Sequence, residues 1–191
     1  MHRHWDSESR NAESSAKACC EVLILIASVI RRFTSSLGGQ GHMSTGSHPR
    51  IGEVSPDEAW CILEEEKNAR LIDVRTHAEW GFVGVPDVQE IGHSPLFIEW
   101  AQYPGMAVNP GFAIEVANAV DIETVGRMLF ICRSGARSLR AAEAVTQHFE
   151  RNGKSVTCLN VSEGFEGDLN ATGQRGTVNG WKARGLAWHQ T

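Results

Sequence analysis

The chain has 191 residues, and its 18 Lys and Arg against 23 Asp and Glu give a formal net charge of −5. Hydrophobic residues make up 41% and charged residues 21%, an ordinary globular composition that excludes a disordered or fibrous protein. The mild acidity argues against partners such as nucleic acid or anionic lipid, and five cysteines at irregular spacing favour a reducing, cytoplasmic location over a disulfide framework.

Residues 1–49 differ in composition from the rest of the chain. They are rich in Ser, Gly and His and contain one apolar run, Val22–Ile30. A run of this length is far short of the roughly 20 residues that cross a bilayer, so we expect no membrane span. We interpret residues 1–49 as an N-terminal extension or linker, disordered or partly helical. Met43 is a candidate start site, and whether residues 1–42 belong to the mature protein stays open.

Regular signals begin at Ile51. Ser55-Pro56-Asp57-Glu58 is a capping box with Pro at the first helical position, and it predicts a helix to about Lys67. Leu71–Val74 is typical of a short buried strand, and Thr76–Glu79 of a second cap with a helical turn. Loop is expected over residues 83–94, around a candidate strand at 88–91. Leu96–Trp100 is ambiguous, and Asn109-Pro110 is expected to cap a helix to about Val120.

The second half of the chain alternates strands and a long helix. Met128–Ile131 has the length of a buried strand, and residues 136–149 have helical spacing closed by Gly153. A further buried strand is predicted at Val156–Leu159. Short apolar strands that alternate with helices predict an α/β domain over residues 50–189, with a mainly parallel central sheet flanked by helices.

The most informative segment is the junction between the strand at 128–131 and the helix after it. In an open α/β sheet, ligands bind beyond the carboxyl ends of the strands, and Cys132 stands at such an end. Backbone N–H groups at the helix start can cradle an anion. The helix dipole, Arg133 and Arg137 favour the nucleophilic thiolate. A lone strand-end cysteine is usually structural, but this combination indicates a reactive one.

These residues resemble a known family. Cys132-Arg133-Ser134-Gly135-Ala136-Arg137 is similar to the active-site loop of the rhodanese-like sulfurtransferases. Leu71–Arg75 with Glu79 and Trp80 resembles that family's Asp-x-Arg strand and nearby Glu. Gly180-Trp181 with Gly185-Leu186 resembles its closing segment. The resemblance covers residues 51–189 and implies a rhodanese-like α/β fold.

The resemblance also implies an activity. Cys132 would carry sulfur as a persulfide, taken from thiosulfate or another persulfide donor and passed to cyanide, a thiol or a carrier protein. The resemblance implies donor binding by Arg133, Ser134, Gly135, Ala136, Arg137 and Ser138. We expect no cofactor, and no metal either, because the sequence has no Cys/His cluster at zinc spacing. A six-residue loop is similar to those of the sulfur-transferring members, whereas the related phosphatases have a loop one residue longer.

Three further residues are expected to support the site. Asp73 is either a turn former or a carboxylate that orients Arg137 or caps the loop helix. Arg75 either steers anionic donors or pairs with Glu79. Glu79 itself is expected to close the Thr76 capping box rather than to take part in chemistry.

The chain departs from the family at two places. The segment from Gly81 to Asp87 differs from the family's usual Gly-His-Ile stretch, and residues 166–179 form an insertion. We hypothesise that this insertion lies beside the mouth of the site, where Asp168 or Arg175 would touch the acceptor; the alternative is a solvated surface loop. A redox pair between Cys132 and Cys158 is also conceivable.

Other functions stay open at this stage. A cysteine-dependent phosphatase or arsenate reductase would use a similar loop, and a non-catalytic interaction or sensor module would use the same fold. The physiological donor, the acceptor and the oligomeric state do not follow from the sequence.

Overall fold

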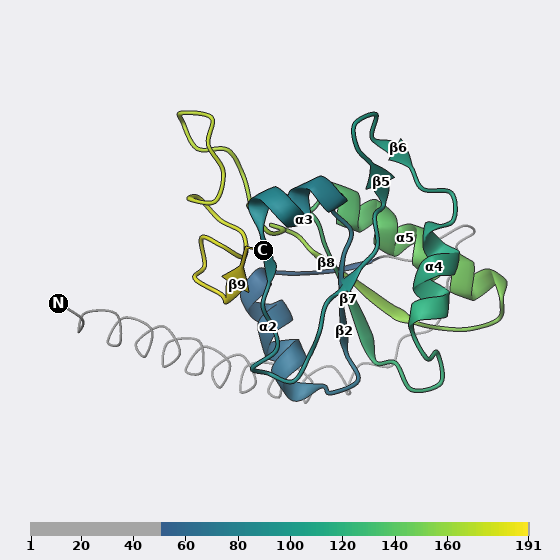
Figure 1. Cartoon of the computed structure of the whole chain (residues 1–191). Coiled ribbons are helices and arrows are strands. Elements are labelled where there is room, and N and C mark those ends of the chain that lie inside the picture. Colours follow the sequence, from purple (N-terminus) through teal and green to yellow (C-terminus); the bar gives the residue numbers. More distant parts are fainter. Residues whose placement is uncertain (1–50, 191) are drawn as a thin grey trace, which may run out of the picture. The chain divides into compact units, whose positions relative to one another are not determined.

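The computed structural model describes residues 51–190 and contains a five-stranded sheet (Figure 1). Its strand order is β1 (Gly52–Val54), β8 (Thr157–Val161), β7 (Arg127–Ile131), β2 (Arg70–Asp73) and β4 (Leu96–Phe97), and all neighbours are parallel. This confirms the rhodanese-like α/β class with a mainly parallel central sheet. The interpretation of residues 1–49 concerns a part of the chain outside the described range.

Four helices accompany the sheet: α2 (Pro56–Glu65), α3 (His77–Val83), α4 (Phe112–Ala119) and α5 (Ala136–Arg151). Both predicted capping boxes are confirmed, because the Ser55 and Thr76 side chains each accept from the N–H three residues on. The helix α4 begins later than predicted. The Asn109 side chain accepts a hydrogen bond from the N–H of Gly111, which itself caps the helix.

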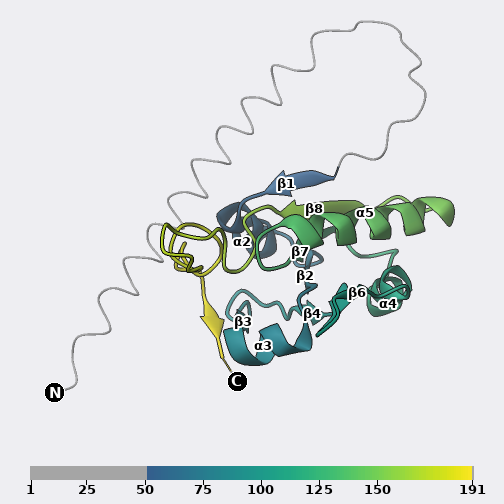
Figure 2. The same ribbon diagram turned by 90° about the horizontal axis from the view of Figure 1, so that it is seen from above.

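The central strands bury both faces, as strands of parallel sheets do. Along β7, Leu129 and Ile131 pack into one core, while Met128 and Phe130 pack into the other. Because successive side chains of a strand point to opposite faces, this apolar run needs helices on both sides. Figure 2 shows α2 and α4 on opposite sides of the sheet. The first core contains residues of α2, and the second contains residues of α4 and α5.

The short strands were not predicted, and one predicted strand is wrong. Residues 89–92 form a turn in which the Gly92 N–H donates to the Gln89 carbonyl, so 88–91 is no strand. The observed strand here is β3 (Val85–Pro86), which pairs antiparallel with β9 (Trp188–His189). A second two-residue pair, β5 (Ala101–Gln102) with β6 (Ala107–Val108), forms a hairpin. Two residues are too few to show a periodic pattern.

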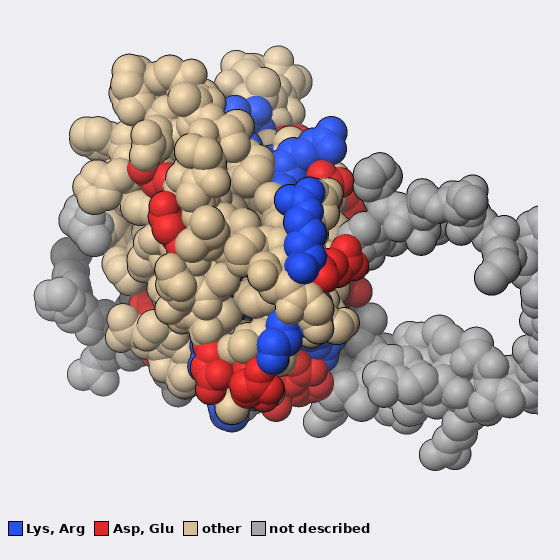
Figure 3. All heavy atoms as spheres, turned by 90° about the vertical axis from the view of Figure 1, so that its right-hand side faces the viewer, with Lys and Arg blue, Asp and Glu red and all other residues tan. Residues whose placement is uncertain are grey.

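The face that carries β6 and α4 is largely uncharged. In Figure 3 the Lys, Arg, Asp and Glu side chains gather toward its borders and leave a broad neutral area. Exposed apolar side chains on the hairpin and on α4 include Tyr103, Val108 and Ile114. None of the helices within residues 51–190 combines the length and the apolar character needed to span a membrane.

Candidate active site

Cys132 directly follows β7, the central strand of the sheet. Its backbone carbonyl accepts a hydrogen bond from the Phe165 N–H at 2.8 Å, and the whole residue is only 1% exposed. Arg133, the next residue, is exposed. The thiol therefore lies at the inner end of the loop, as predicted for the carboxyl end of a buried strand.

The backbone of the loop is oriented by the segment after β8. The Arg133 carbonyl accepts hydrogen bonds from the N–H groups of Glu166 and Gly167 at 2.9 and 3.1 Å. In a planar trans peptide the C=O and the next N–H point in opposite directions. Because the carbonyls of Cys132 and Arg133 face residues 165–167, the N–H groups of Arg133 and Ser134 point the other way. The loop thus presents donors on the side away from this segment.

Gly135 connects the loop to α5 in a backbone conformation that other residues rarely adopt. Its φ is +92°, in the left-handed region, and it serves as the N-cap of α5 without a side-chain cap. A Cβ at this position would collide with the Ser162 carbonyl oxygen. The loop and the β8 segment can approach this closely only because residue 135 is glycine. The first-turn N–H groups of α5 receive no side-chain cap at this N-terminus, and such groups bind anions.

Ser138 lies behind the cysteine and is completely buried. Its Oγ is 3.2 Å from Cys132 Sγ, 3.0 Å from the Gly135 carbonyl oxygen and 2.7 Å from Asn160 Oδ1. The sequence placed Ser138 among the donor-binding residues, whereas in the structure its hydroxyl lies against the Cys132 thiol. Of the other predicted loop residues, Ser134 is half-buried and Ala136 is exposed.

Arg137 is held by Glu79 through two parallel hydrogen bonds of 2.8 and 2.6 Å. Burial lowers the pKa of Arg137, but the hydrogen bonds and charge of Glu79 outweigh it and raise the pKa above its ordinary value. The guanidinium has five N–H donors, of which these bonds use two. Arg137 is therefore a cation held in place at the start of α5.

Glu79 has two tasks, of which only one was predicted. It closes the capping box by accepting from the Thr76 N–H and hydroxyl, both at 2.9 Å. It also anchors Arg137, for which Asp73 was one of the partners considered. Burial raises the pKa of the Glu79 carboxyl, but the hydrogen bonds from Arg137 and Thr76 outweigh it and lower the pKa to about 2. Glu79 is thus ionised at neutral pH and ties α3 to the loop.

The expectation for Arg75 is corrected. Of the two alternatives for Asp73 the turn former is confirmed, because its Oδ1 accepts a hydrogen bond from the Arg75 N–H at 3.0 Å. These two residues form an ion pair with each other, in which Arg75 Nε and Nη2 donate to Asp73 at 2.6–3.1 Å. Both side chains are fully buried. Arg75 therefore neither steers anionic donors at the surface nor pairs with Glu79, and Asp73 does not orient Arg137. Arg75 also donates to the Gly84 carbonyl and stacks on Phe165, whose N–H holds Cys132.

The insertion at residues 166–179 begins at the loop. Glu166 and Gly167 donate to Arg133, as described above, and Arg175 donates to the Gly167 carbonyl. The base of the insertion therefore lies beside the loop, on the side opposite the N–H groups of Arg133 and Ser134, and its position at the mouth of the site stays a hypothesis. A role of Asp168 or Arg175 in acceptor binding stays a hypothesis, since Asp168 contacts Asn179 and Arg175 contacts Gly167, both within the insertion.

The conceivable redox pair of Cys132 with Cys158 is excluded by strand register. Cys158 lies opposite Met128, which is four residues before Cys132 along β7. At roughly 3.3 Å per residue the two cysteines are separated by about 13 Å, well beyond disulfide reach. Burial also raises the pKa of the Cys158 thiol to about 11, so this cysteine stays protonated at neutral pH.

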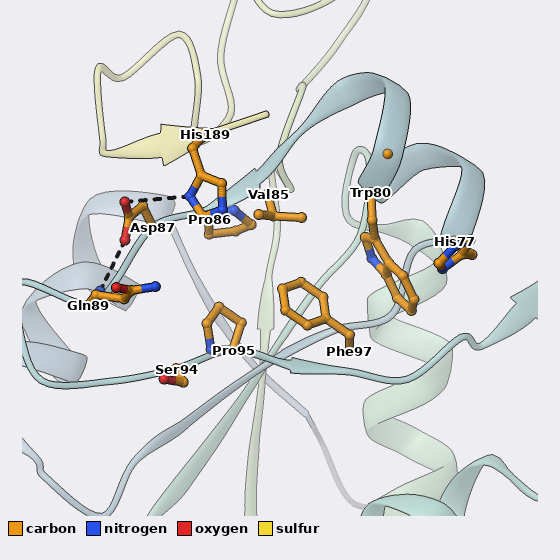
Figure 4. A pocket seen from close by; sticks show the side chains of 11 residues that line it. His77, Trp80, Val85, Pro86, Asp87, Gln89, Ser94, Pro95, Phe97 and His189 are labelled. Atoms are coloured by element: carbon orange, nitrogen blue, oxygen red, sulfur yellow. Dashed lines mark hydrogen bonds and ion pairs between the residues drawn. The ribbon is translucent and has the colours of Figure 1, made fainter. Parts of the chain in front are cut away.

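A separate cavity of about 530 Å³ lies alongside α3, with His77, Trp80 and Gly81 in its lining. Figure 4 shows Trp80 and Phe97 on one side of it and His189, which contacts Asp87 at 3.5 Å, on the other. None of residues 132–138 lines this cavity. Within residues 51–190 no three His, Cys, Asp or Glu side chains are grouped so that they could hold a metal ion.

Asn160 is the residue of the site that the sequence reasoning missed. It lies on β8, is 2% exposed, and contacts Ser138 through its side-chain oxygen. The signal was present in the sequence, because Asn160 is the polar residue inside an otherwise apolar strand end, Cys158–Val161. Buried polar side chains are nearly always hydrogen-bonded, and such a position therefore indicates a partner in the interior.

The chain is similar in sequence to bacterial proteins and in structure to solved proteins. No family model matches it. A Rickettsia rickettsii protein described as "RP600 homolog" is 30% identical over 138 residues, which are 72% of this chain and 97% of the relative. The crystal structure of Rv0390 from M. tuberculosis is 40% identical, with a TM-score of 0.65, and the match covers 74% of this chain and 98% of that one. A rhodanese-like domain protein from Staphylococcus aureus is a more distant neighbour, 18% identical with a TM-score of 0.43, over 74% of this chain and 99% of that chain.

Two of these relatives share at least 30% of their residues with this chain over nearly their whole length. The described part of the chain has the rhodanese-like α/β fold. The protein belongs to the family of the rickettsial RP600 homolog and of Rv0390 from M. tuberculosis.

Proposed function

We propose that this protein is a sulfurtransferase that carries sulfane sulfur as a Cys132 persulfide. The observation that carries the proposal is the position of Cys132, at the end of the central strand β7 and in front of the uncapped N-terminus of α5. The resemblance of the six-residue loop to those of the rhodanese-like sulfurtransferases supports sulfur, rather than a phosphoryl group, as the transferred group.

The reaction has two steps. In the first, the Cys132 thiolate attacks the outer sulfur of thiosulfate, the sulfur–sulfur bond of the donor breaks, and sulfite leaves with the electron pair. In the second, a thiolate or cyanide attacks the outer sulfur of the persulfide, and the Cys132 thiolate leaves. The enzyme returns to its starting state without net oxidation or reduction.

The surroundings of the cysteine support each anionic species of this cycle. The N–H groups of the loop and of the first turn of α5 can donate hydrogen bonds to the thiosulfate anion and to the terminal sulfur of the persulfide. Arg137 supplies a fixed positive charge, and Arg133 supplies an exposed one. An already ionised thiol needs no general base, so the proposal requires no catalytic histidine.

The test is intact-protein mass spectrometry after incubation with thiosulfate. We expect the full chain to gain the mass of one sulfur atom, removable by a reductant, and Cys132→Ser to gain none. Cys158→Ser is the matched control, since this buried cysteine lies far from the loop, and it should load like the unmodified chain. If neither thiosulfate nor glutathione persulfide adds sulfur to Cys132, the proposal fails, and assays with arsenate and phosphate esters would follow.

A further inference from the structure

The hydroxyl of Ser138 has one proton and three acceptors within reach. They are Cys132 Sγ, the Gly135 carbonyl and Asn160 Oδ1, and the contact with Asn160 is the shortest at 2.7 Å. A hydroxyl donates to one acceptor at a time and accepts from others. Ser138 is completely buried, so water does not supply the missing donors. Which acceptor receives the proton therefore decides how well the cysteine sulfur is solvated.

Asn160 and Glu53 fix this choice in the structure. Asn160 Nδ2 donates to Glu53 Oε1 at 3.4 Å, and the two residues lie opposite each other in the pairing of β1 with β8. A carboxylate only accepts hydrogen bonds. Glu53 therefore turns the N–H₂ side of the Asn160 amide toward itself and the oxygen toward Ser138. In this arrangement Ser138 donates to Asn160, and the Cys132 thiol can donate to Ser138.

The opposite arrangement suits the thiolate. An ionised Cys132 needs a donor, so the Ser138 hydroxyl must turn to it, and its lone pairs then face Asn160 Oδ1 at close range. Rotation of the amide by half a turn relieves this contact, because Nδ2 then donates to Ser138 Oγ. The rotation breaks only the long bond to Glu53, which is an exposed residue. The chain of four side chains thus has two self-consistent hydrogen-bonding patterns.

We propose that Asn160 is a positioning residue for the nucleophile. The orientation of its amide directs the Ser138 proton and so sets the balance between thiol and thiolate at Cys132. Glu53 biases the amide toward the pattern that suits the thiol. This rests on the proposed use of Cys132 as a nucleophile. The other charged groups around the cysteine are Arg133 in the loop, Arg137 on α5 with Glu79 on α3 behind it, and the buried pair of Asp73 and Arg75.

The test measures the rate of alkylation of Cys132 by iodoacetamide in the full chain as a function of pH, read at the Cys132 peptide by mass spectrometry. Because only the thiolate reacts, the midpoint of this profile reports ionisation without any sulfur transfer. Asn160→Asp, whose ionised carboxylate can only accept, should move the midpoint up by about one pH unit, the size of one hydrogen bond to a charged group.

Glu53 provides the matched comparison, at an exposed position on the edge strand β1. Glu53→Gln and Glu53→Ala remove the same charge, but only Gln can donate to the turned Asn160 oxygen. We expect both to lower the midpoint, and Gln to lower it further by about half a pH unit. In the Ser138→Ala background, checked for folding by circular dichroism, the difference between Gln and Ala should vanish.

Two results would overturn the proposal. Equal midpoints for Glu53→Gln and Glu53→Ala would reduce the effect of Glu53 to its charge alone. A difference that persists without the Ser138 hydroxyl would show that the influence does not pass through that residue. Failure of the sulfurtransferase proposal would look different, because Cys132 would still show a normal alkylation profile and yet take up no sulfur from thiosulfate.

Discussion

Two glycines allow the cysteine loop to lie against the segment after β8. Gly135 has a left-handed φ of +92° and faces the Ser162 carbonyl, while Gly164 has a φ of +66° and faces the backbone of Cys132 to Ser134. At both positions a Cβ would meet backbone atoms, which cannot move aside as a flexible side chain can. The shape of the cysteine loop therefore depends on contacts between two backbones, with no side chain between them.

Gly135→Ala should impair sulfur loading, whereas the same substitution at Gly153 should not. Left-handed backbone costs a non-glycine residue roughly 1–2 kcal/mol, and the collision with Ser162 adds to that. Gly153→Ala is the matched control, since Gly153 also has a positive φ, +69°, but faces open space. We expect both variants to lose stability in urea unfolding, and only Gly135→Ala to lose sulfur loading as well. Equal loading of the two variants would show that the loop tolerates the extra carbon.

At the level of elements, the short helix α3 delivers one side chain to the site. Its seven residues include no buried one, so the helix is held by its capping box, by the pair of Glu79 with Arg137, and by neighbouring segments. Lys182 Nζ and Gln190 Nε2 donate to carbonyls of its last turn, at Val83 and Phe82. The position of Glu79, and with it that of Arg137, thus depends on a helix that lies on the surface.

The pair of Glu79 with Arg137 predicts a pH dependence. The pKa of Glu79 is lowered from an ordinary 4.5 to about 2. A lowered pKa stabilises the fold above the unfolded-state value, and this contribution is lost as pH falls from about 4.5 toward 2. Glu79→Gln should therefore lower the free energy of unfolding by on the order of 2 kcal/mol near neutral pH, with a smaller difference at pH about 3. Urea unfolding of both proteins at the two pH values measures this. A difference that does not change with pH would show that the carboxylate is not the source of the stabilisation.

The sequence predicted these elements unevenly, for physical reasons. Capping boxes at Ser55 and Thr76 and the apolar runs of β2, β7 and β8 are local patterns, so the elements and the α/β class follow from them. The position of Cys132 follows as well, because a strand and a helix flank it directly. The partner of Arg137 does not follow, since Glu79 is 58 residues away in the chain and only the folded sheet brings α3 to α5. The pair of Asp73 and Arg75 could have been predicted from the sequence, because residues two apart in an extended chain point to the same side.

At the level of the whole molecule, this buried ion pair connects three segments. Asp73 ends β2, Arg75 donates to the Gly84 carbonyl after α3, and its guanidinium lies 4.0 Å over the ring of Phe165 after β8. Within the described residues one nitrogen of Arg75, Nη1, is buried without a hydrogen-bond partner, and the aromatic ring offers a favourable face to the cation. The pair holds together segments that are far apart in the chain.

Removal of one partner should destabilise the protein strongly. Arg75→Met leaves the Asp73 carboxylate buried and unpaired, which typically costs about 3–5 kcal/mol. The double variant Asp73→Asn with Arg75→Met removes the buried charge altogether and should lose less stability than the single variant. Urea unfolding of the three proteins measures the difference. If the second substitution adds a further loss, the destabilisation comes from lost packing rather than from the unpaired charge.

The central place of β7 has a consequence for how this family can diversify. The strand beside it on one side carries Asn160 and leads to Gly164, and the strand on the other side leads to α3 and Glu79. Among the described residues, the outer strand β4 and the hairpin after it donate no hydrogen bond to residues 132–138. Changes at that margin, such as a longer hairpin or a surface for a new partner, would therefore leave the surroundings of Cys132 unchanged.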